Sequence, residues 1–129
     1  MADRSYDRGG LRVLELGPAG APIAGDRDAA DLVGAAFETR ARLIVIPVAR
    51  LCDDFFRLAS GVAGSVLQKF VNYRLRVVIV GDLSGHVARS ETFKDFVEES
   101  NRGSAVWFAA TPEALEARLL SAPPPGSRG

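Results

Sequence analysis

The chain has 129 residues, of which 47% are hydrophobic and 25% are charged, and its 16 basic residues balance its 16 acidic residues. This length is typical of one domain with a sizeable core, and the zero net charge disfavours nucleic acid or an anionic membrane as a partner. The single cysteine, Cys52, excludes an intramolecular disulfide and a multi-cysteine zinc site. The sequence has neither an apolar run long enough to span a bilayer nor the apolar core of a signal peptide, so we expect a cytoplasmic protein.

The beginning of the chain is expected to contain an arm, a strand and a turn. Residues 1–9 are polar and predict a flexible arm, whereas the alternating apolar residues of 11–16 predict the first strand. Residues 17–20 form a turn signal, and residues 21–24 are long enough for a short returning strand. We expect residues 10–121 to form one domain, followed by a disordered Pro/Gly-rich tail over residues 122–129.

Helices and strands alternate in the rest of the domain. Strands are predicted at residues 43–48, 76–80 and 105–109. The first of these should end or bulge at Pro47, because proline cannot donate a ladder hydrogen bond. Helices are predicted to begin at Asp26 or Asp28, at Ser60, at Ser90 and at Thr111. The first helix should run to about Thr39 and bury one face that carries Leu32, Val33, Ala36 and Phe37.

This order of elements predicts a single α/β domain with a mixed, mostly parallel sheet of about four to five strands and about four helices. In such sheets, binding and catalytic sites lie at the carboxyl ends of the strands. Several residues with reactive or polar side chains follow predicted strands and should gather at that edge: Arg50, Cys52, Asp53, Asp54, Asp82, Ser84 and His86. The beginning of the helix at Ser60 is expected nearby.

These residues indicate a possible ligand site, and each has a plainer alternative. Arg50 would hold an anionic group, and Asp82 or His86 would move a proton. Asp82 is more commonly a turn or cap residue, and a lone His86 is more commonly a solvated loop residue than a metal ligand. No metal is expected, because no second type of metal ligand clusters with His86. No cofactor is expected, and the glycines form no phosphate-loop or dinucleotide pattern that would indicate a nucleotide. The residues predicted to bind a ligand are Arg50, Asp54, Asn72, Tyr73, Asp82 and Ser84.

Six short motifs along the chain resemble those of one protein family. They are Phe55-Phe56, Ser60-Gly61-Val62-Ala63-Gly64, Gln68-Lys69-Phe70, Asn72-Tyr73-Arg74, Val80-Gly81-Asp82 and Glu99-Ser100-Asn101-Arg102-Gly103. With these motifs the chain resembles the bacterial DUF4180 family over residues 11–120, and it departs from that family at Ser65, where the family pattern has Glu. The name denotes a domain of unknown function, so the resemblance implies little about mechanism.

A more distant resemblance is to STAS domains, the anti-sigma-factor antagonist fold. It rests on Ser60-Gly61-Val62-Ala63 at the beginning of a helix and on the segment FAATPEAL at residues 108–115. The resemblance implies a STAS-like architecture in which the helix-opening serine is phosphorylated to switch partner binding, a role that only Ser60 matches. Ala59 stands where that family has an acidic residue. Judged from the residues alone, Ser60 is an ordinary N-cap.

Two classes of function remain open. The first, which we favour, is a non-enzymatic regulatory or protein-interaction module that binds a protein partner through the beginning of the Ser60 helix and the adjacent loops. The second is a small-molecule-binding protein or a small enzyme that uses the strand-end cluster. Convergence of Arg50, Asp82 and His86 on one cavity would favour the second class. A homodimer through a sheet edge or a helix face is compatible with either.

Overall fold

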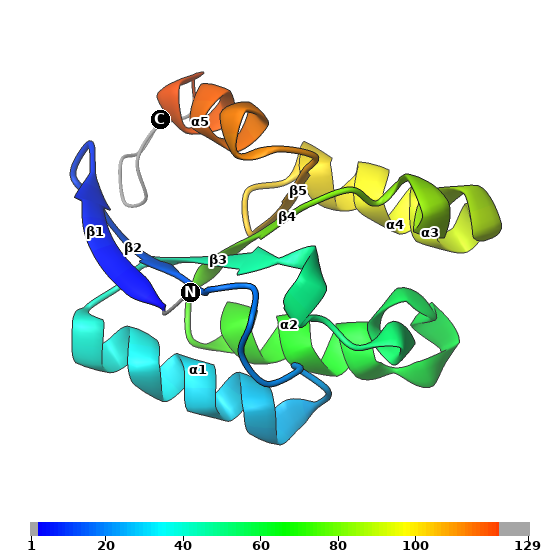
Figure 1. Cartoon of the computed structure of the whole chain (residues 1–129), viewed down its shortest axis with the longest axis horizontal. Coiled ribbons are helices and arrows are strands. Elements are labelled where there is room, and N and C mark those ends of the chain that lie inside the picture. The colour runs from blue at the N-terminus through cyan, green and yellow to red at the C-terminus, as the bar shows by residue number, and fades with distance from the viewer. Residues whose placement is uncertain (1–2, 122–129) are drawn as a thin grey trace.

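Five strands form one sheet in the order β1-β2-β3-β4-β5, with helices on both of its faces (Figure 1). The structure is a computed structural model that describes residues 3–121, with the side chains of residues 3–119. The strands are β1 (Arg4–Arg8), β2 (Leu11–Glu15), β3 (Leu43–Pro47), β4 (Arg76–Val80) and β5 (Val106–Ala109). The helices are α1 (Asp26–Thr39), α2 (Val62–Asn72), α3 (Ser84–Arg89), α4 (Glu91–Arg102) and α5 (Pro112–Ser121). Three short 3₁₀ turns between β3 and α2 cover Val48–Arg50, Asp53–Phe56 and Leu58–Ser60. The predicted tail over residues 122–129 lies outside the described residues.

The sheet is mixed because β1 runs antiparallel to β2, whereas β2, β3, β4 and β5 are parallel. The two central strands pair over their whole length, from Leu43 opposite Arg76 to Pro47 opposite Val80. Their apolar, largely β-branched residues are typical of parallel strands that are covered on both faces. β3 ends at Pro47, as the missing backbone donor predicts. The predicted single α/β domain with a mostly parallel sheet is confirmed.

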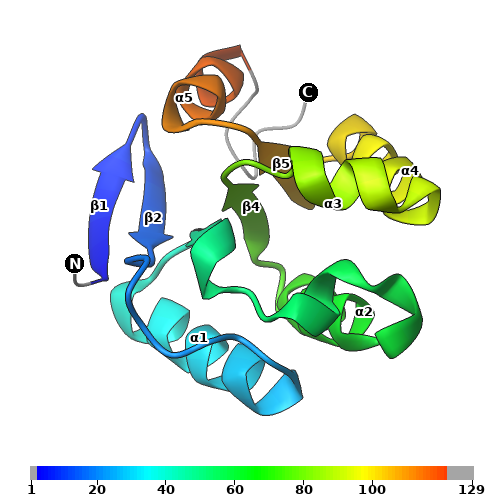
Figure 2. The ribbon, with the colours of Figure 1, turned by 45° about the vertical axis from the view of Figure 1, so that its right-hand side comes forward.

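The two faces of the sheet are covered unequally. α1, α2 and α4 contribute to the core on one face, where Phe55, Phe70 and Phe93 are fully buried. On the other face α5 is the one described helix that contributes, and its Leu115 belongs to a smaller core with Trp107. Both ribbon views place α1 and α2 on the opposite side of the sheet from α5 (Figure 2). The unequal cover leaves part of the second face open.

β1 corrects the prediction of a flexible arm over residues 1–9. Residues 4–8 pair with β2, from Arg4 opposite Glu15 to Arg8 opposite Leu11. Gly9 and Gly10 connect the two strands with φ values of 58° and 84°, a region that favours glycine. The strand is polar because it lies at the edge of the sheet, where most of its side chains meet solvent. An edge strand of this kind has no apolar periodicity by which the sequence would have predicted it.

Three further expectations were wrong or incomplete. Residues 21–24 form no strand, and Ile23 makes only an isolated bridge to Leu51. Phe37 is 59% exposed rather than buried, because a helix turns about 100° per residue and its neighbour Ala36 takes the inward position. α3 is an additional helix where the sequence predicted only a loop, since its 6 residues are too few to show an apolar period.

Two predicted helix caps are confirmed, and a third helix begins later than predicted. The side-chain oxygen of Ser90 accepts a hydrogen bond from the Phe93 amide at 3.1 Å, and that of Thr111 accepts one from the Ala114 amide at 3.1 Å. α2 begins at Val62 because Gly61 takes the N-cap position, with φ of 82°. None of the helices within residues 3–121 combines the length and hydrophobicity needed to cross a membrane.

Candidate functional site

The structure places Arg50 in the protein interior rather than in a cavity. The residue is 8% exposed, and its guanidinium donates from Nε to the carbonyl oxygen of Ala21 at 2.9 Å and from Nη1 to that of Gly17 at 2.8 Å. A longer ion pair joins Nη1 to Asp3 at 3.5 Å. A Cβ atom at Gly20 would collide with the guanidinium, so a larger residue there would have to displace Arg50 from these carbonyl oxygens. Arg50 therefore fastens the loop after β2 to the segment after β3.

Asp82 and Ser84 close the turn at the end of β4. Oδ1 of Asp82 accepts a hydrogen bond from the Ser84 amide at 2.9 Å, and this bond lowers the pKa of the Asp82 carboxyl. Gly81, just before it, has φ of 148°, and a Cβ atom there would collide with Val48. Asp82 thus takes the turn-forming role that the sequence left as the alternative.

His86 lies against an aromatic ring instead of beside Arg50. It stacks on Phe56 with ring centroids 3.7 Å apart and planes 7° from parallel, and Nη2 of Arg89 lies 3.2 Å from its Nδ1. Asp54 forms an ion pair with Arg57 at the nearby surface. The adjacent hollow of about 420 Å³, the His86 hollow, is lined by Asp53, Phe56, Arg57, His86, Arg89 and Ser90. Arg50 and Asp82 do not line this hollow, so the three residues predicted to converge do not share a cavity in the described structure.

The environment of His86 makes a pH dependence testable. Burial, followed by the positive charge of Arg89, lowers the pKa of His86 below its ordinary value of 6.5, while Asp53 and Asp82 partly oppose the shift. Because the unfolded chain then binds this proton more readily than the folded protein, stability should fall as the pH drops through about 6.5. His86→Phe keeps a ring on Phe56 and removes the titration. Urea unfolding at about pH 8 and about pH 5.5 should show a smaller loss of stability in the variant; equal losses would show that His86 is not responsible.

Ser60 is exposed at the beginning of α2, but its hydroxyl is occupied. The Oγ atom donates to the carbonyl oxygen of Asp54 at 2.6 Å and accepts from the Val62 amide at 3.2 Å. Ser60 therefore closes the turn that leads into α2 rather than serving as the N-cap itself. At the other end of the helix, the Asn72 side chain accepts from Gln68 at 2.8 Å.

The ends of α1 and α2 carry an exposed aromatic pair surrounded by arginines. Phe37 is 59% exposed and Tyr73 is 49% exposed, and their rings meet edge to face with centroids 5.8 Å apart. The hollow of about 350 Å³ beside them is lined by these two rings and by Arg40, Arg42 and Arg74, together with three smaller side chains. We name these five residues the aromatic–arginine patch. Within residues 3–119, the side chains of its three arginines form no hydrogen bond or ion pair.

Both helices end in the same backbone motif, with arginine in a position that usually belongs to glycine. Arg40 after α1 has φ of 61°, and Arg74 after α2 has φ of 60°. The Ala41 amide donates at 2.8 Å and the Leu75 amide at 2.9 Å, each to the carbonyl five residues earlier. These bonds define a Schellman motif, in which a residue other than glycine costs roughly 1 kcal/mol. The two arginines therefore project from strained backbone positions on the same surface, and such strain is frequent at functional sites.

A comparison with known protein families assigns the chain. The family model described as Domain of unknown function (DUF4180) matches residues 8–119. The chain belongs to the DUF4180 family. Comparisons with curated proteins and with solved structures found no match. In this DUF4180 protein the motif residues Phe55 and Asn101 stabilise the fold. Phe55 is fully buried, and Oδ1 of Asn101 accepts a hydrogen bond from the Phe108 amide at 2.7 Å. Tyr73 and Arg74 are motif residues that lie in the patch.

The sequence predicted one residue of the patch, Tyr73, as a binding residue, but it did not predict which residues surround Tyr73. It assigned Phe37 to the core and did not select the arginines. A usable signal was present, because the two helices lead into strands through similar segments, Arg40-Ala41-Arg42-Leu43 and Arg74-Leu75-Arg76-Val77. Arg76 is the exception within this repeat, since its guanidinium lies over the Trp107 ring at 4.5 Å and is not part of the patch.

The strained arginines give a stability prediction for this DUF4180 protein. Arg40→Gly and Arg74→Gly should each raise the free energy of unfolding by about 0.5–1 kcal/mol, because glycine adopts positive φ without the steric cost. Arg57→Gly is the matched control, since Arg57 is exposed and has φ of −104°. That control should lower stability through the greater entropy of the unfolded chain. Urea unfolding followed by Trp107 fluorescence measures the free energy of unfolding of all three variants. A loss of stability in both patch variants would show that the backbone at Arg40 and Arg74 is not strained.

Proposed function

We propose that this DUF4180 protein is a non-enzymatic protein-binding module and that the aromatic–arginine patch is its binding surface. The observation that carries the proposal is an exposed Phe37–Tyr73 pair surrounded by three arginines that lack a partner within residues 3–119. Contiguous exposed apolar patches that are rimmed by polar residues often mark protein interaction sites. Aromatic residues and arginine are also the residue types that are enriched in protein interfaces and at their hot spots.

The chemistry of the patch selects an acidic partner with an apolar anchor. Guanidinium groups bind carboxylates with two parallel hydrogen bonds, and three unpaired groups favour a segment with several Asp or Glu residues. The hollow beside Phe37 and Tyr73 is bordered by Ala36, Ala41 and Leu75, so it suits one aromatic or aliphatic side chain of the partner. We therefore propose a short acidic segment with a single large apolar residue as the partner.

A symmetric homodimer through the patch is disfavoured. A two-fold axis would bring the arginines of one copy against those of the other, and like charges in an interface cost binding energy. A homodimer would need another surface, for which the edge strands β1 and β5 are the candidates.

We extend the proposal to a STAS-like, regulatory module of the bacterial cytoplasm. The N-terminal hairpin, the alternation of helices and strands that follows it, and the exposed Ser60 before α2 support this architecture. Phosphorylation of Ser60 would break its hydrogen bond to Asp54 and change the connection into α2. Ser60 lies at the end of α2 opposite the patch, so this change would act on the patch through the position of α2. Ser60→Asp should then alter partner affinity, whereas Ser65→Asp, also exposed and on α2, should not. Equal affinities for the two variants would remove Ser60 from the proposal.

The experiment that tests the binding function is a selection from a displayed library of short disordered segments, with the full chain as bait. We expect wild type to enrich acidic segments that carry one aromatic or aliphatic anchor. The double variant Phe37→Ser, Tyr73→Ser should lose them. Val71→Ser is the matched control, because Val71 is another exposed large hydrophobic residue and does not line the hollow. Failure to enrich any segment, or enrichment that survives the double variant, would reject the patch as the binding surface.

A further inference from the structure

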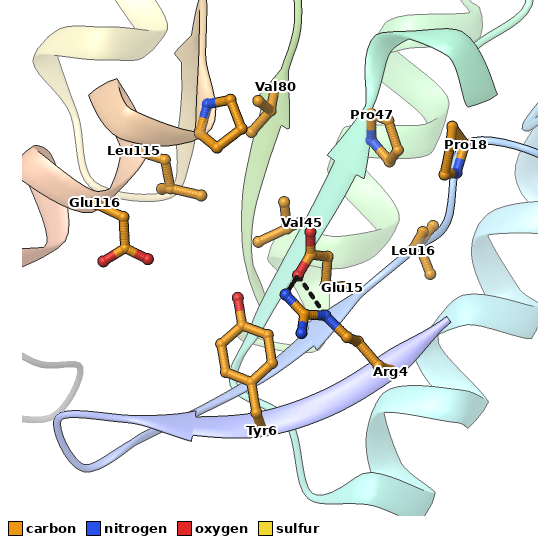
Figure 3. A pocket seen from close by; sticks show the side chains of 11 residues that line it. Arg4, Tyr6, Glu15, Leu16, Pro18, Val45, Pro47, Val80, Leu115 and Glu116 are labelled. Carbon is orange, nitrogen blue, oxygen red and sulfur yellow. Dashed lines mark hydrogen bonds and ion pairs between the residues drawn. The ribbon is translucent and has the colours of Figure 1, made fainter. Parts of the chain in front are cut away.

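A third hollow lies on the sheet face that α5 covers only in part (Figure 3). Its volume is about 320 Å³, and residues from β1, β2, β3, β4 and α5 line it. It lies at the carboxyl ends of the parallel strands, since Pro18 follows β2, Pro47 ends β3 and Val80 ends β4. That edge is where open α/β sheets place their ligands. It is also the opposite end of the sheet from the aromatic–arginine patch, whose Arg42 and Arg74 precede β3 and β4.

The walls of this third hollow, which we name the proline-lined hollow, are mainly apolar. Val45 and Val80 of the sheet and Leu115 of α5 face it, and Figure 3 shows the Tyr6 ring rising from β1 with its hydroxyl directed into the space. The prolines at positions 18, 47 and 112 border it and have no amide hydrogen to donate. The backbone of these prolines therefore donates no hydrogen bond to a ligand.

The charges around the proline-lined hollow cancel in pairs. Nε and Nη2 of Arg4 both contact Oε1 of Glu15, at 3.0 and 2.9 Å. Glu116 forms an ion pair with Arg8. Both carboxylates are therefore neutralised by arginines of β1, and a charged ligand would have to compete with an existing ion pair. Burial and the neighbouring Glu15 raise the pKa of Tyr6, so its hydroxyl stays protonated at neutral pH.

We propose that the proline-lined hollow binds a neutral one- or two-ring molecule that carries a hydrogen-bonding group, held between the Tyr6 ring and the valines of β3 and β4. The volume is about twice that of an apolar cavity of roughly 150 Å³ that holds benzene. The ring occupies the apolar walls, and its polar group reaches the Tyr6 hydroxyl and the Glu15 carboxylate. The balanced charge of the border excludes anions and cations alike. This site is independent of the proposed protein-binding function, because it uses none of the residues of the patch.

The experiment is a titration of the full chain, with isotope-labelled amide and methyl groups, followed by NMR. The probes are 2-naphthol and indole, which are neutral, and 2-naphthoate, which has the same rings and a negative charge. We expect saturable shifts at Val45, Val80 and Leu115 with the neutral probes, and at least about tenfold weaker binding of 2-naphthoate. Tyr6→Phe keeps the ring and should weaken the binding of 2-naphthol by about three- to tenfold. This factor is the effect of losing one hydrogen bond.

A filling variant distinguishes a site from a non-specific apolar surface. Val80→Phe should occupy the hollow and abolish binding of 2-naphthol, whereas the matched Val71→Phe on the exposed side of α2 should bind like wild type. If Val80→Phe does not fold, as judged by Trp107 fluorescence, Tyr6→Phe decides the question alone. Absence of saturable binding by both neutral probes, equal affinity for 2-naphthoate, or unchanged affinity in Tyr6→Phe would each overturn the proposal. None of these outcomes bears on the patch, so the two proposals fail separately.

Discussion

Replacement of Arg50 by Met will lower the free energy of unfolding by about 2–4 kcal/mol. The carbonyl oxygens of Gly17 and Ala21 would lose their donors within a site where Arg50 is only 8% exposed. A buried acceptor without a partner costs about 1–3 kcal/mol, and methionine retains most of the packing volume, so the lost hydrogen bonds dominate the effect. Urea unfolding followed by the fluorescence of Trp107, the single tryptophan, measures the change.

Arg57→Met is the control for this prediction. Arg57 is exposed, and its described contact is an ion pair with Asp54 that lies three residues away. Surface pairs of this kind contribute about 0–1 kcal/mol, so the control should remain close to wild type. If the two variants were equally stable, Arg50 would not have the structural role assigned to it. The prediction from the sequence that Arg50 binds an anionic group would then be favoured again.

Charge reversal at Arg74 will weaken binding of an acidic partner segment by about thirtyfold or more. Arg74 has no partner within residues 3–119, so its guanidinium is available, and Glu in its place would repel the carboxylates that it attracts. Loss of a hot-spot residue typically costs about 2 kcal/mol, which corresponds to a factor of about thirty. Fluorescence anisotropy with a labelled segment from the library selection measures the affinity.

Arg27→Glu is the matched control, because Arg27 is also exposed and also unpaired within the described residues but lies at the beginning of α1, away from the patch. It should change affinity by no more than about twofold, through the net charge alone. The affinity of wild type should also fall as salt is added, since exposed charges are screened. Equal losses in the two variants would mean that the effect is one of net charge, and the patch would have no specific role.

Much of the fold could be predicted from the sequence because most of its helices and strands have local sequence patterns. The apolar β-branched runs at β3 and β4 and the apolar stripe of α2 recur at the spacing of a strand or a helix. Ser90 and Thr111 fix helix beginnings through hydrogen bonds to amides only three residues away. β1 escaped prediction because it is stabilised by pairing with β2 and not by an apolar pattern of its own. α3 was not predicted because it is short, and the sequence there indicates only the turn that Asp82 closes.

The candidate site was harder to predict because it depends on side-chain direction. Sequence order places Arg50 at the carboxyl end of β3, but only the folded loop at residues 17–21 shows that its donors are already occupied. Phe37 and Ala36 are neighbours in the sequence, and the rotation of α1 decides which of them is exposed. The meeting of Phe37 with Tyr73 joins the ends of two helices that are separated along the chain by β3. Such proximity is a property of the fold and has no local signature.

The most direct test of the protein-binding account is an NMR titration of the full chain, labelled with ¹⁵N, with an acidic segment from the library selection. We expect amide shifts concentrated at residues 36–42 and 72–75, which saturate together and which need about thirtyfold more of the segment, or more still, in Arg74→Glu. Shifts that cluster instead at the His86 hollow or the proline-lined hollow, with the ends of α1 and α2 unchanged, would contradict the assignment of the binding surface to the aromatic–arginine patch.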